Sequence, residues 1–201
     1  PLGMLKEGAV NAGNGRNMLP FSGTLDGNGH TLTFTKGSKP LFGYVRDAKV
    51  KNLNIFGTYI DGYGLVENYV VDYGKDSKLW TDDDPKAAIT AEKVIIKSGT
   101  KILQSGFIGG YASGINHANF MDCMIEQGVI IGCKADGSSA GLSNVGSFSG
   151  ASNGVIKNCV SYATVYGNNN VGGIAGIRGQ STNTFNIEDC VFHGAINATG
   201  N

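Results

Sequence analysis

Short segments in which apolar and polar residues alternate recur along this chain, separated by turns rich in Gly, Asn and Asp. The stretch VIKNCVSYATV places Ile156, Val160 and Tyr162 in one phase, and Cys159 and Val165 in the other. Alternation with a period of two is typical of β-strands, and no segment shows a convincing amphipathic-helix period. Neither phase is apolar throughout, so we expect a bend within the segment.

The alternating segments are copies of one repeat. Three copies contain an apolar residue, one further residue, then Asp or Asn, then Cys, and a glycine-flanked apolar group precedes each copy. An earlier copy has Asn52-Leu53 in place of the Asn-Cys pair. The copies read LFGYVRDAKVKNLNIFG from Leu41, NFMDCMIEQGVIIG from Asn119, GVIKNCVSYATVYG from Gly154 and FNIEDCVFHGAINATG from Phe185.

Short strands and glycine turns that recur about every 30 residues predict a solenoid, in which each repeat forms one coil. Equivalent residues of successive coils then stack at about 4.8 Å. Cysteine packs as a small hydrophobe, so its thiols are expected in the core. A disulfide that involves Cys133, which lies outside the repeat pattern, is the alternative. The two expected internal rows are Leu53, Cys123, Cys159 and Cys190, and Ile108, Phe148 and Ile174.

The runs VGGIAG, VIKNCVSYATVYG and FSGTLDGNGHTL resemble the GLUG-type repeats of bacterial surface proteins, over residues 21–72 and 104–201. The resemblance implies an all-β fold, a right-handed parallel β-helix of the pectate-lyase-like superfamily. We expect one domain over residues 1–201, excised from a longer chain. It would comprise a tag remnant and N-terminal lead-in at 1–20 and one surface insertion at about 72–104. The resemblance also implies an extracellular or cell-surface location in a bacterium.

Composition excludes several classes of partner and chemistry. Positive and negative side chains balance at 16 each, so there is no electrostatic footprint for nucleic acid. No apolar run approaches the length of a membrane span, so no membrane insertion is predicted. The sequence contains no HExxH, GxSxG or P-loop motif, so it lacks the sequence signatures of zinc peptidases, serine hydrolases and P-loop nucleotide-binding proteins.

Two carboxylates are the best candidates for catalytic residues if the protein is an enzyme. Asp122 and Asp189 each precede a repeat cysteine, so neighbouring coils would bring them near each other. A polysaccharide lyase or glycoside hydrolase works with clustered carboxylates, which in glycosidases are about 5–10 Å apart. The equivalent positions hold Asn52 and Asn158, however. A row that mixes Asp with Asn is interpreted here as a hydrogen-bonded ladder.

The candidate ligand-binding residues lie in the predicted insertion. They are Tyr73, Trp80, Asp82, Asp83 and Asp84. An aromatic ring beside acidic groups can stack on a sugar while its neighbours accept hydroxyl hydrogens. The aspartates also have the oxygen chemistry that Ca²⁺ takes, and no other cofactor is predicted. The alternative is that Trp80 packs the insertion onto the body and the aspartates form a solvated turn.

These observations favour a non-catalytic module of a bacterial cell-surface or secreted protein. Like the adhesins that it resembles, it would bind a glycan or a host surface protein and be flanked by other domains of its parent chain. One alternative is a rigid structural spacer. A further alternative is a polysaccharide lyase or glycoside hydrolase.

Overall fold

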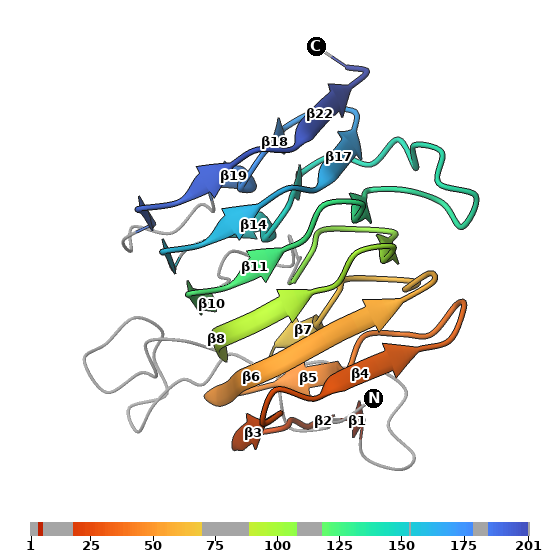
Figure 1. Cartoon of the computed structure of the whole chain (residues 1–201). Coiled ribbons are helices and arrows are strands. Elements are labelled where there is room, and N and C mark those ends of the chain that lie inside the picture. Colours follow the sequence, from red (N-terminus) through yellow and green to blue (C-terminus); the bar gives the residue numbers. More distant parts are fainter. Residues whose placement is uncertain are drawn as a thin grey trace.

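The computed structural model describes residues 4–5, 18–69, 89–107, 118–152, 154–178 and 185–200, and every structural statement below concerns these ranges. All regular elements within them are β-strands, and most strands pair in parallel. Strands of successive repeats lie side by side in a curled stack that rises from the N-terminal to the C-terminal repeat (Figure 1). The predicted all-β class with parallel strands is therefore confirmed.

The strands follow the repeats in chain order. A short antiparallel pair, β1 (Met4–Leu5) and β2 (Met18–Leu19), precedes the repeats. The first three repeats contribute β3 (Thr24–Asp26), β4 (Thr31–Phe34), β5 (Phe42–Val45), β6 (Ala48–Gly57), β7 (Val66–Tyr69), β8 (Ile89–Ile96) and β9 (Lys101–Ile102). The next contributes β10 (Ala118–Met121), β11 (Met124–Ile125), β12 (Ile130–Ile131), β13 (Val145–Gly146) and β14 (Ser149–Ser152). The last two contribute β15 (Val155–Lys157), β16 (Val160–Ser161), β17 (Thr164–Gly167), β18 (Val171–Gly172), β19 (Ala175–Arg178), β20 (Asn186–Glu188), β21 (Val191–Phe192) and β22 (Ala195–Ala198).

The largest sheet joins the opening strands of all repeats. Strand β6 pairs with β3 and β4 on one side and with β8 on the other. From β8 the pairing continues through β10 and β11 to β15 and β16, and then to β20 and β21. A second sheet has the order β22-β17-β12-β9, and β5 with β7, β13 with β18 and β14 with β19 form further parallel pairs. Equivalent residues of the repeats therefore lie one above another.

The predicted cysteine row is present. Cys123 and Cys159 are buried, and Cys190 in the last repeat is half-buried. Val94 of β8, which pairs with Leu53, occupies the position between Leu53 and Cys123. All four cysteines are free, including the buried Cys133, so the disulfide alternative is not realised. The Cys123 side chain and burial both raise the pKa of Cys159, which keeps this thiol protonated.

The bend expected within the alternating segments occurs at the residue before each member of the cysteine row. Ile156 is buried on β15, and Asn158 then adopts a φ of 52°. After this residue the buried phase shifts, so that Cys159, Ser161 and Val165 face the core. A single left-handed residue thus explains why neither phase of the segment is apolar throughout.

The second predicted row needs a correction at one position. The Phe107 N–H donates to the Phe148 carbonyl at 3.0 Å, and the Phe148 N–H donates to the Ile174 carbonyl at 2.9 Å. Phe107, rather than Ile108, is therefore the residue that stacks below Phe148, and Ile108 lies outside the described ranges. The glycine-flanked group GFIGG offers two adjacent apolar residues, and the sequence pattern does not distinguish them.

The predicted insertion also ends earlier than expected. Residues 89–104 were assigned to it, yet β8 is the central strand of the largest sheet. Ile89, Ala91, Val94 and Ile96 are each fully buried there. The sequence of β8 lacks the marker of the other repeats, because Lys93-Val94 stands in place of an Asn or Asp followed by Cys or Leu. Residues 70–88, the rest of the predicted insertion, lie outside the described ranges.

Candidate functional site

The binding residues predicted from the sequence fall outside the part of the chain that the structure describes. Tyr73, Trp80 and Asp82–Asp84 lie between the end of β7 and the start of β8. Their role in binding stays a prediction. Two other places in the described ranges have the polar groups that a site requires: the Asp/Asn row of the main sheet and a hollow beside Tyr63.

The Asp/Asn row lies at the bend of the main sheet. Its five members have φ values between 51° and 53°. This left-handed region is disfavoured for most L-residues and is tolerated best by Gly, Asn and Asp. The members, one above another in successive repeats, are Asn52, Lys93, Asp122, Asn158 and Asp189.

Two members of this row donate side-chain hydrogen bonds to the preceding repeat, one of them to another member of the row. The Asn158 amide donates to Asp122 Oδ1 at 3.3 Å, and the Asn52 amide donates to Asp26 Oδ1 at 3.0 Å. The Asn52 contact is the largest reason why the pKa of Asp26 falls to about 2. Asn158 lies between Asp122 and Asp189, because Lys157 pairs with Met121 on one side and with Glu188 on the other. The ladder interpretation is therefore confirmed at Asn158, which separates the two aspartates of the row.

Lys93 is the one member of the ladder that is neither Asn nor Asp. We expect Lys93→Asn to raise the free energy of unfolding by about 1 kcal/mol, because Asn tolerates a φ of 53° better than Lys does. The measurement is urea unfolding followed by circular dichroism. Lys36→Asn, at an exposed turn without a positive φ, is the matched control and should change stability by less than about 0.5 kcal/mol. Equal effects of the two substitutions would contradict the ladder argument.

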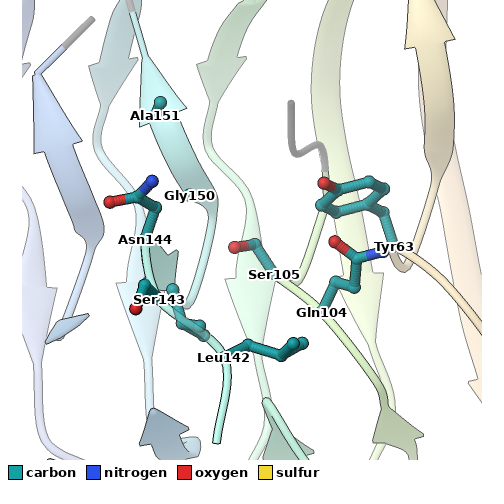
Figure 2. Close-up of a pocket in the computed structure, with 9 residues that line it drawn as sticks. Tyr63, Gln104, Ser105, Leu142, Ser143, Asn144, Gly150 and Ala151 are labelled. Atoms are coloured by element: carbon teal, nitrogen blue, oxygen red, sulfur yellow. The ribbon is translucent and has the colours of Figure 1, made fainter. Parts of the chain in front are cut away.

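A hollow of about 140 Å³ opens beside Tyr63, and we call it the Tyr63 hollow. Three successive repeats line it: Tyr63 comes from the second, Gln104 and Ser105 from the third, and the remainder from the fourth. Figure 2 shows the lining side chains arranged around this space. The full lining is Tyr63, Gln104, Ser105, Leu142, Ser143, Asn144, Val145, Gly150 and Ala151.

Hydrogen bonds hold two of the polar lining groups in place. The buried Ser105 Oγ accepts the N–H of Gly146 at 3.3 Å. Asn170 Nδ2 donates to Asn144 Oδ1 at 2.7 Å, and both asparagines have positive φ values. This pair forms a second ladder, at the entry to β13 and β18. The position of the Asn144 amide is therefore fixed by the stacking of repeats.

The electrostatics of the Tyr63 hollow suit an uncharged ligand. None of its lining residues carries a charged side chain. Burial, followed by the nearby Glu67 carboxylate, raises the pKa of Tyr63 to about 12, so the phenol keeps its proton and is able to donate a hydrogen bond. Burial also raises the pKa of Glu67, whose Oε2 is buried without a hydrogen-bond partner in the described residues. The hollow thus presents hydroxyls, amides and one aromatic ring.

Sequence reasoning did not find this hollow. Its polar residues come from three repeats and share no motif, so their meeting depends on the register of the stack. One usable signal was present: Asn144 and Asn170 both directly precede a Val-Gly pair. Alignment of these two positions would have indicated a second ladder next to β13.

The described residues hold no group of three or more His, Cys, Asp or Glu side chains arranged for a metal ion. They also contain no long apolar helix of the kind that crosses a bilayer. No family model, curated protein or solved structure matches this chain.

Proposed function

We propose that this chain is a non-catalytic, carbohydrate-binding module of a bacterial cell-surface or secreted protein, built as a right-handed parallel β-helix. The in-register parallel pairing of successive repeats supports the β-helix. The repeat motifs that resemble GLUG-type sequences support the bacterial surface location. Flanking domains of a parent chain would be its other partners.

The Tyr63 hollow is the observation that carries the binding proposal. Neutral sugars are rich in hydroxyls and have apolar C–H faces, so they match a site of amides, hydroxyls and one aromatic ring. At about 30 Å³ per water, a hollow of about 140 Å³ has room for four or five waters. That space suits a substituent, such as an acetamido or hydroxymethyl group, with the rest of the sugar lying on the surface.

A glycan array, probed with and without calcium, tests this function. The best ligand is then titrated by calorimetry against Gln104→Ala, which removes one amide from the hollow. We expect affinity to fall at least about tenfold, in line with the loss of one or two buried hydrogen bonds. Gln127→Ala, at an exposed turn, is the matched control and should bind as the parent chain does. An array without a selective ligand, or equal binding by both variants, would overturn the proposal.

A rigid spacer is the second candidate, and the continuous core favours it. Buried apolar side chains run from Phe42 in the first repeat to Val165 in the fifth without a gap. Such a stack resists bending and would hold another domain away from a surface. This role predicts that no glycan on the array binds. It also predicts that deletion of repeats shortens the distance at which the parent protein holds its other domain from the surface.

A further inference from the structure

A line of apolar side chains points outward across the main sheet, on the opposite side of its strands from the cysteine row. Four residues in register form it, one each from β8, β11, β16 and β21, and we call it the apolar line. Met124 is 38% exposed and Val191 is 42% exposed, and the other two are half-buried. Its members are Ile95, Met124, Val160 and Val191.

Polar positions border the apolar line on both sides. Two residues before each member lies the Asp/Asn ladder, and two residues after each member lies an outward position with a long or aromatic side chain. The second border contains an ion pair between Lys97 and Glu126. It also contains the rings of Tyr162 and His193, which stack with their centroids 5.3 Å apart. The line is therefore one residue wide, with the stacked Tyr162–His193 pair beside its C-terminal end.

The size of this surface argues against a protein partner. Met124, Tyr162 and Val191 are each about two-fifths exposed. With roughly 200 Å² for a large side chain, they offer on the order of 250 Å². A standard protein interface needs about 800 Å² on each side, with few charges at its centre. Here charged residues lie directly beside the apolar line.

From this arrangement we infer that the apolar line is a binding track for an extended, neutral polysaccharide. Four rungs at the strand spacing of about 4.8 Å span about 15 Å, which accommodates a few sugar units. The apolar faces of the rings would lie on Met124, Val191 and Tyr162, and their hydroxyl edges would reach the polar borders. The two borders together carry two lysines and three carboxylates, so they nearly cancel and favour an uncharged polymer.

This inference rests on the proposed carbohydrate-binding function, but it uses none of the residues of the Tyr63 hollow. The two surfaces have separate roles, because a hollow holds one substituent whereas a track holds a chain. A substitution in one surface therefore tests that surface without changing the other.

Affinity electrophoresis through gels that contain soluble xylan, mannan, hydroxyethyl cellulose or the anionic polygalacturonate tests the track. We expect retardation by at least one neutral polymer, none by polygalacturonate, and at least a fivefold weaker affinity for Tyr162→Ala. Tyr166→Ala, on β17 of the same repeat, is the matched control and should be retarded as the parent chain is. Thermal melts of both variants ensure that only folded protein is compared.

Several outcomes separate the two proposals. Unchanged retardation of Tyr162→Ala overturns the track. If Gln104→Ala abolishes binding in the same experiment, the track is wrong, whereas the Tyr63 hollow and the proposed carbohydrate-binding function are retained. Absence of retardation by all neutral polymers overturns the track as well. A dimer in sedimentation that Tyr162→Ala dissociates would overturn it in favour of a second copy on this face. Loss of binding for Tyr162→Ala but not for Tyr166→Ala supports it.

Discussion

Gly106→Ala is expected to lower the free energy of unfolding by about 3 kcal/mol or more, one of the two largest effects of any single substitution considered for this chain. A Cβ at this position would overlap the carbonyl oxygen of Ser147 in the next repeat and lie 3.3 Å from Ile125 Cδ1. The obstacle is backbone, so no side-chain rotation relieves the overlap. Whole repeats would have to separate, with loss of the hydrogen bonds between them.

The same close approach recurs one repeat earlier, where a Cβ on Gly64 would overlap the Gly106 carbonyl. Gly23→Ala is the matched control, because its new Cβ would come no nearer than 3.7 Å to another group and its φ is not positive. Thermal unfolding should show a fall in Tm of about 6–12 °C for Gly106→Ala and almost none for Gly23→Ala. A Tm for Gly106→Ala within 2 °C of the parent chain would show that the repeats are less tightly stacked than described.

The sequence allowed the cysteine row to be predicted because its marker is local. An Asn or Asp in the left-handed region followed by a buried or half-buried residue forms a two-residue signature, and it recurs at four of the five bends in the row, with Lys93 as the exception. The sequence alone therefore places Cys123, Cys159 and Leu53 in one row. The same reasoning predicted the bend, since a residue at positive φ shifts the alternation by one.

The sequence did not predict the structure correctly where another residue replaces the left-handed Asn or Asp, or where two adjacent apolar residues fit the same position. Strand β8 was assigned to an insertion because Lys93 occupies the left-handed position, although Lys is seldom found there. Phe107 and Ile108 are adjacent and both apolar, so only the hydrogen bonds to Phe148 distinguish them. Packing between repeats decides both cases, and a single repeat does not contain that information.

The candidate sites were harder to predict than the fold, for the same reason. Tyr63 and Gln104 are far apart in sequence and lie in different phases of the repeat, so no motif links them. Met124 and Val160 give no signal by themselves in the sequence, because isolated exposed apolar residues are common on proteins. Only the register, which aligns them with Ile95 and Val191, turns them into a continuous surface.

Phe148→Ala is the second substitution expected to have a large effect, with a loss of about 3–5 kcal/mol in the free energy of unfolding. Phe148 is fully buried, stacked on Phe107 with ring centroids 5.2 Å apart and tilted against Phe120 at 6.1 Å. Truncation removes both ring contacts and leaves a cavity between two repeats. Phe56→Ala, where the ring is half-buried, is the matched control and should cost clearly less.

A ligand measurement separates a cavity from a collapsed core in the Phe148→Ala variant. If the neighbouring repeats stay in place, the space left by the ring is apolar and bounded by Phe107 and Phe120. Benzene should then bind there and restore part of the lost Tm, as apolar cavities of ring size stay dry and accept such ligands. Rigid stacking is what both proposed binding surfaces require, since each depends on side chains held in register by separate repeats. If benzene does not raise the Tm of the variant, the repeats close over the cavity. The stack would then be too deformable to hold the side chains of the Tyr63 hollow and of the apolar line in register.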